Sequence, residues 1–87
     1  MKLKVVVGIN LKYYRYQTGL SQEKFYTRLG LNHKYLASVE RGKANISIDY
    51  VEDLAHRIGV STEDLVTFKE EHVIKKKRVD EKIKVVN

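Results

Sequence analysis

The residues best suited to chemistry lie in one stretch, 21–42, which reads SQEKFYTRLGLNHKYLASVERG. Their side chains are cations, amides and hydroxyls that recur on the polar side of two short predicted helices. Such groups donate hydrogen bonds to phosphate oxygens and to base edges. The leading interpretation is therefore DNA binding through a short helix. The set comprises Gln22, Lys24, Arg28, His33, Lys34, Ser38, Arg41 and the adjacent Lys43.

Apolar residues in the same stretch show what must position those side chains. Phe25 and Leu29 share one face of the first helix, while Leu36 and Val39 share one face of the second, beyond a joint at Gly30. A helix pair of this size cannot bury its apolar faces alone. It must therefore pack on other helices of the chain.

Helical periodicity and end signals predict those other helices. Val7, Leu11 and Tyr14 recur at i, i+4 and i+7, which predicts a first helix over residues 6–17. Capping residues and glycine stops bound the remaining helices. The N-caps are Ser21, Asn32, Ser47 and Ser61, and the stops are Gly19, Gly30 and Gly59. The fold class is therefore all-α: a compact five-helix domain over 1–68 with a helix-turn-helix at 21–41, then a short basic C-terminal extension over 69–87.

Composition restricts the other functions. The 87 residues suit one small domain, and without cysteine there is neither a disulfide framework nor a thiolate metal site. The three histidines lie far apart, and no nucleophile–base pair or phosphate-binding glycine loop is recognisable. We therefore expect no enzyme, metal, cofactor or small-molecule substrate. No apolar run reaches the ~20 residues of a membrane span or has the form of a signal peptide, so we expect a cytoplasmic protein without a membrane partner.

Charge is distributed unevenly along the chain. The net charge is +6, and residues 12–43 hold seven basic side chains against two acidic ones. Residues 44–68 hold one basic side chain against five acidic ones. One part of the domain is thus cationic and another anionic, an arrangement that attracts a polyanion to one face. Ordinary surface solubility is the alternative interpretation of the same charges.

A series of short matches carries a family resemblance. Arg15 is followed in order by TGLSQE at 18–23, LGLN at 29–32, Leu36, VERGK at 39–43, NIS at 45–47 and IGVSTEDL at 58–65. The series resembles the helix-turn-helix family of lambda-repressor-like (XRE or Cro-like) transcriptional regulators over about 62 of the 87 residues. Its size and loop lengths also resemble restriction-modification controller proteins and small phage or mobile-element repressors. We leave these branches open.

The resemblance implies roles for individual residues. The third helix is expected to lie in the major groove of double-stranded DNA, where Lys34 would donate to guanine O6 and N7. Tyr35 would either lay its hydroxyl on a phosphate or pack inside the domain. The implied base contacts are His33, Lys34 and Ser38; the implied phosphate contacts are Gln22, Tyr35, Arg41, Lys43 and Asn45; and Arg15 and Glu40 are implied to form a partly buried structural ion pair.

A homodimer on a two-fold operator is the assembly that the resemblance implies. Its dimer surface would lie around Leu65 and Phe68 in the fifth helix. The alternative function is an antitoxin-type or other protein-interaction module on the same fold.

The chain departs from the family pattern at two places. Tyr26 stands where alanine is usual, so we expect its ring to reach an edge or to force the second and third helices apart. Ile9, Tyr13 and Tyr16 form an apolar stripe on a face that the family leaves polar. We expect the extension, through Val79, Ile83 and Val86, to cover this stripe, or both to form a dimer surface. Two alternatives remain open: that residues 3–7 and 83–86 pair as β-strands, and that the basic run 75–78 either contacts DNA or is simply solvated.

Overall fold

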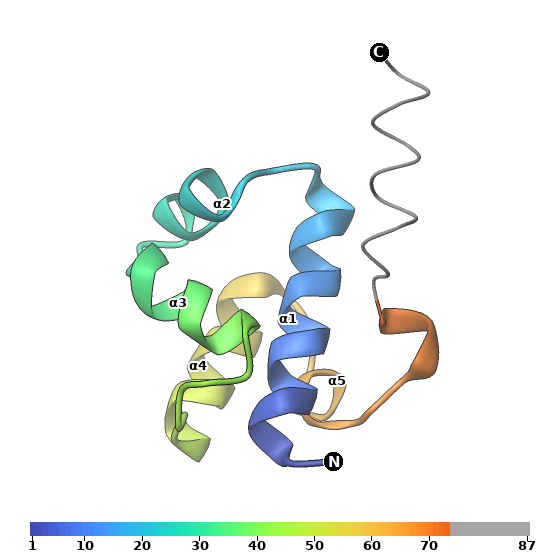
Figure 1. The fold of residues 1–87 in the computed structure, drawn as a ribbon. Helices are drawn as coiled ribbons and strands as arrows, with labels where there is room; N and C mark the ends of the chain where they lie inside the picture. The colour runs from blue at the N-terminus through green and yellow to red at the C-terminus, as the bar shows by residue number, and fades with distance from the viewer. Residues whose placement is uncertain (74–87) are drawn as a thin grey trace.

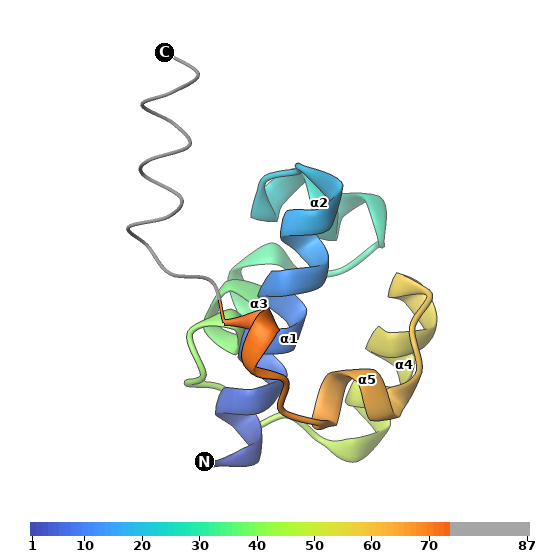
Figure 2. The ribbon, with the colours of Figure 1, turned by 90° about the vertical axis from the view of Figure 1, so that its right-hand side faces the viewer.

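Helix α1 is the element on which most of the others pack. The structure, a computed structural model, describes residues 1–73 and contains five α-helices and no strand within that range. The helices are α1 (Leu3–Thr18), α2 (Gln22–Arg28), α3 (His33–Glu40), α4 (Ile48–Ile58) and α5 (Thr62–Val66), followed by a 3₁₀ turn, η1 (Glu70–His72). Helices α2 and α3 lie on one side of α1, and η1 lies on the other (Figures 1 and 2). The fold is thus the predicted all-α, five-helix arrangement.

Local signals account for the helix ends. Each predicted N-cap accepts a hydrogen bond from a backbone amide in the first turn of its helix, and Ser61 with Asp64 completes a capping box. Gly19 and Gly59 adopt the left-handed conformation that ends α1 and α4. The predicted caps and these stops are therefore confirmed. The N-caps are Ser21, Asn32, Ser47 and Ser61.

The N-terminal segment is helical, which contradicts the β-strand alternative from the sequence. Residues 3–7 are the first turns of α1, so pairing of this segment as a β-strand is wrong. Within this helix, Leu3 and Val7 lie about one turn apart and line the same pocket. Residues 83–86, the proposed partner strand, lie outside the described part of the chain.

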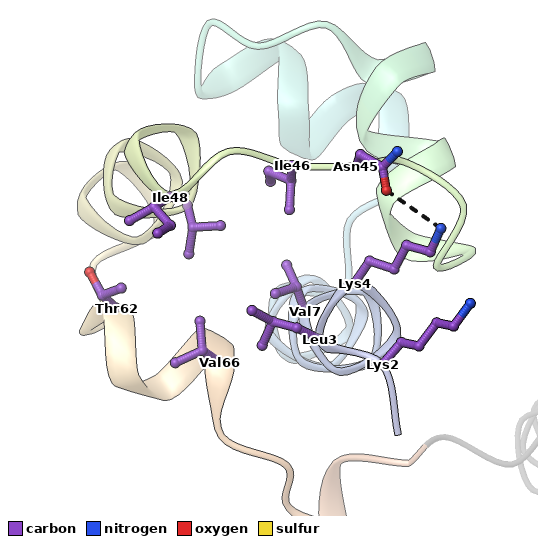
Figure 3. A pocket seen from close by; sticks show the side chains of 10 residues that line it. Lys2, Leu3, Lys4, Val7, Asn45, Ile46, Ile48, Thr62 and Val66 are labelled. Atoms are coloured by element: carbon purple, nitrogen blue, oxygen red, sulfur yellow. Dashed lines mark hydrogen bonds between the residues drawn. The ribbon is translucent and has the colours of Figure 1, made fainter.

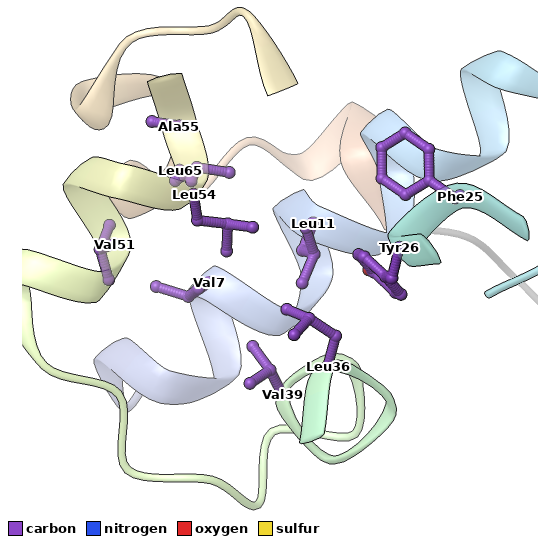
Figure 4. Packing of buried hydrophobic residues seen from close by; sticks show 10 residues of the cluster. All are labelled: Val7, Leu11, Phe25, Tyr26, Leu36, Val39, Val51, Leu54, Ala55 and Leu65. Atoms are coloured by element: carbon purple, nitrogen blue, oxygen red, sulfur yellow. The ribbon is translucent and has the colours of Figure 1, made fainter. Parts of the chain in front are cut away.

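The core is an apolar layer between α1 and the surrounding helices. Val7 and Leu11 of α1 lie between Leu36 of α3 and Leu54 of α4 (Figure 4). Leu65 of α5 joins the same cluster and is 0% exposed. The expectation that Leu65 contributes to a dimer surface is therefore wrong, because its side chain is used inside the monomer. Helix α5 ends at Val66, which leaves Phe68 beyond the helix and 43% exposed.

Gly8 sets the approach of α1 to α3. A Cβ atom built at Gly8 would lie 2.4 Å from the carbonyl oxygen of Val39 and 3.0 Å from that of Glu40. Backbone therefore packs against backbone where α1 meets the C-terminal end of α3. Gly8 was not singled out from the sequence. The only available signal was that a glycine lies inside a predicted helix, although glycine weakens helix formation.

Gly8→Ala should destabilise the protein, although alanine is the better helix former by about 0.5–1 kcal/mol. The added methyl group would force α1 and α3 apart at a backbone contact, and overpacking of this kind lowers the free energy of unfolding by about 1–3 kcal/mol. Urea unfolding followed by circular dichroism measures the change. A higher unfolding midpoint for the variant would contradict the close contact.

Candidate nucleic-acid interface

Helix α3 presents the predicted base-contacting residues. Leu36 and Val39 are buried on its inner side, which fixes how the helix is turned. Lys34 is exposed, and Ser38 follows it by one helical turn and is half-buried. His33 opens the helix and is also half-buried. The fold therefore places these polar groups together at the start and along the outer side of α3.

Tyr35 packs within the domain. Its ring meets that of Tyr50 in α4 edge to face, with centroids 5.4 Å apart and an interplanar angle of 74°. Such aromatic pairs contribute about 0.5–1.5 kcal/mol beyond their buried area. Packing, one of the two interpretations of this residue, is thus present, and it holds α3 against α4.

The loop after α3 carries the predicted phosphate contacts. Arg41, Lys43 and Asn45 are exposed between the end of α3 and the start of α4. Lys4 of α1 also reaches this loop, where its Nζ donates to Asn45 Oδ1 at 3.5 Å. Sequence reasoning missed Lys4, because a contact between residues 41 positions apart has no local signal. Lys4 therefore places one more cation beside this loop.

Glu40, the last residue of α3, forms a bidentate ion pair with Arg15 of α1. Arg15 Nε lies 2.7 Å from Glu40 Oε2, and Arg15 Nη2 lies 2.8 Å from Oε1. The two side chains are 10% and 2% exposed. Arg15 Nη1 also donates to the backbone oxygen of Leu20 at 3.1 Å, which ties the link before α2 to the same pair. The ion pair therefore joins α1 to the C-terminal end of α3.

Helix α2 contributes two more donors to the same carboxylate. Gln22 Nε2 donates to Glu40 Oε1 at 3.1 Å, so one amide hydrogen of this predicted phosphate contact is already used. The Tyr26 hydroxyl donates to Glu40 Oε2 at 2.5 Å. Tyr26 is 0% exposed, so the expectation that its ring reaches an edge is wrong. The ring stays inside because Glu40 offers its hydroxyl a buried acceptor.

These donors keep Glu40 ionised. Burial alone would raise the pKa of the Glu40 carboxyl, but hydrogen bonds from Arg15, Tyr26 and Gln22 together hold it below its ordinary value. The hydrogen bond to Glu40 raises the pKa of Arg15. Burial, followed by the bond to the carboxylate, raises the pKa of Tyr26 strongly. The hydroxyl is therefore a stable donor at neutral pH.

Comparison with known proteins identifies the family. The family model described as helix-turn-helix matches residues 11–65, which is more than half of the chain. The chain belongs to the helix-turn-helix family. It is 39% identical over 67 residues to an uncharacterized HTH-type transcriptional regulator of Sinorhizobium fredii, covering 77% of this chain and 87% of that protein. It is also 34% identical over 64 residues to the control protein C.MunI of a Mycoplasma species, covering 72% and 86% of the two chains.

A solved helix-turn-helix structure supports the same assignment. The crystal structure of the hypothetical transcription factor NHTF from Neisseria superposes with a TM-score of 0.71 at 31% identity and covers 80% of each chain. The resemblance to XRE-type regulators is thereby confirmed. The protein is a transcriptional regulator of the helix-turn-helix XRE type.

The other side of α1 in this helix-turn-helix protein is covered by the start of the C-terminal extension. His72 stacks on Tyr13 with centroids 3.8 Å apart, and its Nδ1 lies 2.8 Å from Asn10 Oδ1. Asn10 Nδ2 donates to the backbone oxygens of Leu65 and Thr67 at 2.8 and 3.0 Å. The buried pair Asn10 and His72 therefore fastens residues 65–72 to α1. The positions of the histidines in the sequence did not indicate this contact.

This contact changes the interpretation of the apolar stripe. Ile9 and Tyr13 are half-buried, and only Tyr16 is 38% exposed. His72 covers part of this stripe at Tyr13, and the apolar residues of the extension are also expected to cover it. Those residues, Val79, Ile83 and Val86, and the basic run 75–78 lie outside the described part of the chain.

A pocket of about 450 Å³ opens at the N-terminal end of α1. Its apolar wall includes Leu3, Ile48 and Val66, from α1, α4 and α5, while Lys2 and Lys4 stand at its rim (Figure 3). Leu3 is 57% and Ile48 76% exposed. Sequence reasoning did not predict this apolar surface, because three separate helices form it.

Within residues 1–73, no group of three or more His, Cys, Asp or Glu residues is arranged to hold a metal ion. No helix in the same range is long and apolar enough to cross a membrane.

Glu40→Gln should lower the free energy of unfolding at pH 7 by about 3 kcal/mol, because it leaves Arg15 buried without a counter-charge. The folded pKa of Glu40 is depressed, so its contribution is complete above the ordinary value of 4.5 and is lost as the pH falls through the folded pKa. Urea unfolding at pH 7 and at pH 3 should therefore show a difference from wild type that shrinks in acid.

The exposed Glu52 on α4 supplies the matched control for this measurement. Glu52→Gln should leave stability nearly unchanged at both pH values. Equal stability of the Glu40→Gln variant and the wild type at pH 7 would contradict the structural importance of the ion pair.

Proposed function

We propose that the protein regulates transcription by binding a specific operator sequence as a homodimer, with α3 in the major groove of double-stranded DNA. The observation that carries this proposal is the division of α3 into a buried apolar side and a polar side. Leu36 and Val39 anchor its inner side, while Lys34 and Ser38 project one turn apart on the other. A short helix held in this way can enter the major groove, which is wide enough for an α-helix.

Base reading falls to the first turns of α3. Lys34 donates to guanine O6 and N7, and Ser38 can donate to or accept from either base type. His33 donates or accepts according to its tautomer. These contacts set sequence preference, since phosphate contacts carry no direct sequence information.

Phosphate binding falls to the loop after α3 and to α2. Arg41 and Lys43 are exposed cations directly after the recognition helix, and Asn45 lies two residues further on. Gln22 keeps one amide hydrogen for a phosphate while the other orients its side chain on Glu40. Release of counterions by these contacts makes affinity dependent on salt.

The dimer surface is proposed at the pocket by α1 instead of at Leu65. Leu3, Ile48 and Val66 form an apolar patch there, and the first two are largely exposed. Lys2 and Lys4 border the patch on the α1 side. The neighbouring first turns of α4 and α5 are acidic, at Asp49 and Glu63.

A second copy of this chain fits such a surface. Two-fold symmetry places the same patch against itself, so the cationic and acidic borders can face each other across the axis. The two recognition helices would then reach successive major grooves, about 34–36 Å apart. Similarity to a control protein favours the restriction-modification controller branch. The antitoxin-type alternative rested on the stripe on α1, which His72 now partly covers.

Selection of bound sites from random duplex DNA, followed by fluorescence anisotropy, tests the proposal. The protein should enrich a two-fold-related sequence and bind it at least ~10³-fold more tightly than random duplex at the same salt concentration. Equal affinity for all duplexes would refute sequence-specific regulation.

Lys34→Ala and Lys43→Ala should change DNA binding in different ways. Loss of the base contact at Lys34 should relax discrimination at one position of the operator by about 1–3 kcal/mol. Loss of Lys43 should weaken all sequences alike and reduce the salt slope by about one ion. Anisotropy titrations against single-base operator variants at several salt concentrations separate the two effects. The assignment fails if the two variants behave identically.

Ile48→Asp should convert the dimer into a monomer. It places a charge in the most exposed part of the apolar patch. An acid is favourable in the first turn of α4, so the variant should remain folded. Sedimentation velocity measures the state of assembly, with Gln17→Asp, at the opposite end of α1, as the control. A dimer that persists in the Ile48→Asp protein places the interface elsewhere.

A further inference from the structure

Both oxygens of the Glu40 carboxylate accept hydrogen bonds from neighbouring side chains. Oε1 accepts from Arg15 and Gln22, and Oε2 accepts from Arg15 and Tyr26. These donors come from α1 and α2, while Glu40 ends α3. One side chain therefore determines how three helices meet at the C-terminal end of the proposed recognition helix.

Tyr26 is the stiff member of this network. Arginine and glutamine reach Glu40 through long chains with several rotatable bonds, whereas the tyrosine ring has only two χ angles. The ring is fully buried, belongs to the core cluster and packs edge to face on Phe25 at 5.1 Å. Because packing holds the ring, it also holds the position of the hydroxyl that Glu40 must meet.

The backbone of α1 also confines the end of α3. The carbonyl oxygens of Val39 and Glu40 lie against Gly8 of α1. The turn that follows is closed by backbone bonds from Gly42 to Val39 and from Lys43 to Ser38, at 2.9 and 3.1 Å. A change in the Glu40 side chain is therefore passed to α3 and to the loop that carries Arg41 and Lys43.

We propose that Tyr26 is a positioning residue for DNA recognition. Its buried hydroxyl holds Glu40, and through Glu40 it sets the angle of α3 and the place of the following loop. Tyr26 itself touches no base or phosphate. This inference rests on the proposed function, because the angle of α3 matters only if α3 reads DNA. It gives the tyrosine a role in specificity.

Tyr26→Phe tests the inference, because it removes one oxygen and keeps the buried ring. At a temperature where the variant is fully folded, its affinity for the selected operator should fall about tenfold, or ~1.4 kcal/mol. Its affinity for random duplex, which depends on charge more than on helix angle, should change less than about twofold. Amide resonances of α3 and residues 41–43 should shift in the ¹H–¹⁵N spectrum of the free protein.

Two control variants separate positioning from stability. Tyr14→Phe removes a tyrosine hydroxyl from α1 outside the Glu40 network, and Leu54→Val loosens the core in α4. Both should keep the wild-type ratio of operator to random-duplex affinity, even where stability drops.

The outcomes of these measurements are distinct. A wild-type protein without any operator preference overturns the proposed function. If the wild type discriminates and Tyr26→Phe keeps the same ratio, the inference is wrong and the hydroxyl serves stability alone. Loss of discrimination in Leu54→Val to the same degree leads to the same conclusion.

Discussion

The arrangement of α1, α2 and α3 depends on one buried carboxylate. Glu40 accepts four hydrogen bonds from three side chains, and two of those bonds come from a single guanidinium. An ionised carboxylate is stable away from water only when such donors replace its hydration. Because the donors stand on different helices, satisfying Glu40 requires those helices to meet in one geometry. The interaction therefore acts mainly on orientation, and apolar burial provides most of the stability.

Apolar packing and the carboxylate restrict α3 in different ways. Leu36 and Val39 decide which side of the helix is buried, but an apolar contact is not directional. The hydrogen bonds at Glu40 are directional, and the close approach of α1 at Gly8 leaves no space for a side chain; both act at the C-terminal end of α3. The N-terminal end is held separately, by the Asn32 cap and by Tyr35 against Tyr50. A helix fixed at both ends and along one side can present its remaining polar groups reproducibly.

Local features were predictable, and contacts between distant segments were less so. The N-caps at Ser21, Asn32 and Ser47 follow from side-chain chemistry within one turn, and the structure contains all three. The edge position expected as one alternative for Tyr26 was wrong, because steric reasoning considered the size of the ring and not the acceptor for its hydroxyl 14 positions later. Leu65 was assigned to a dimer surface through the family resemblance, which does not say whether the same chain buries its side chain. His72 and Asn10, 62 positions apart, had no signal in sequence.

The sequence by itself determined the helices, their ends, the helix-turn-helix motif and the polar residues along α3, because periodicity, capping and motif spacing act over a few residues. It also indicated the pairing of Arg15 with Glu40, through resemblance to a family. Only the tertiary structure decided that Tyr26 and Gln22 share the same carboxylate, that Gly8 lets α1 touch α3, and that Leu3 and Ile48 border one apolar pocket. Those contacts depend on the crossing of whole helices, and the crossing results from all their packed side chains together.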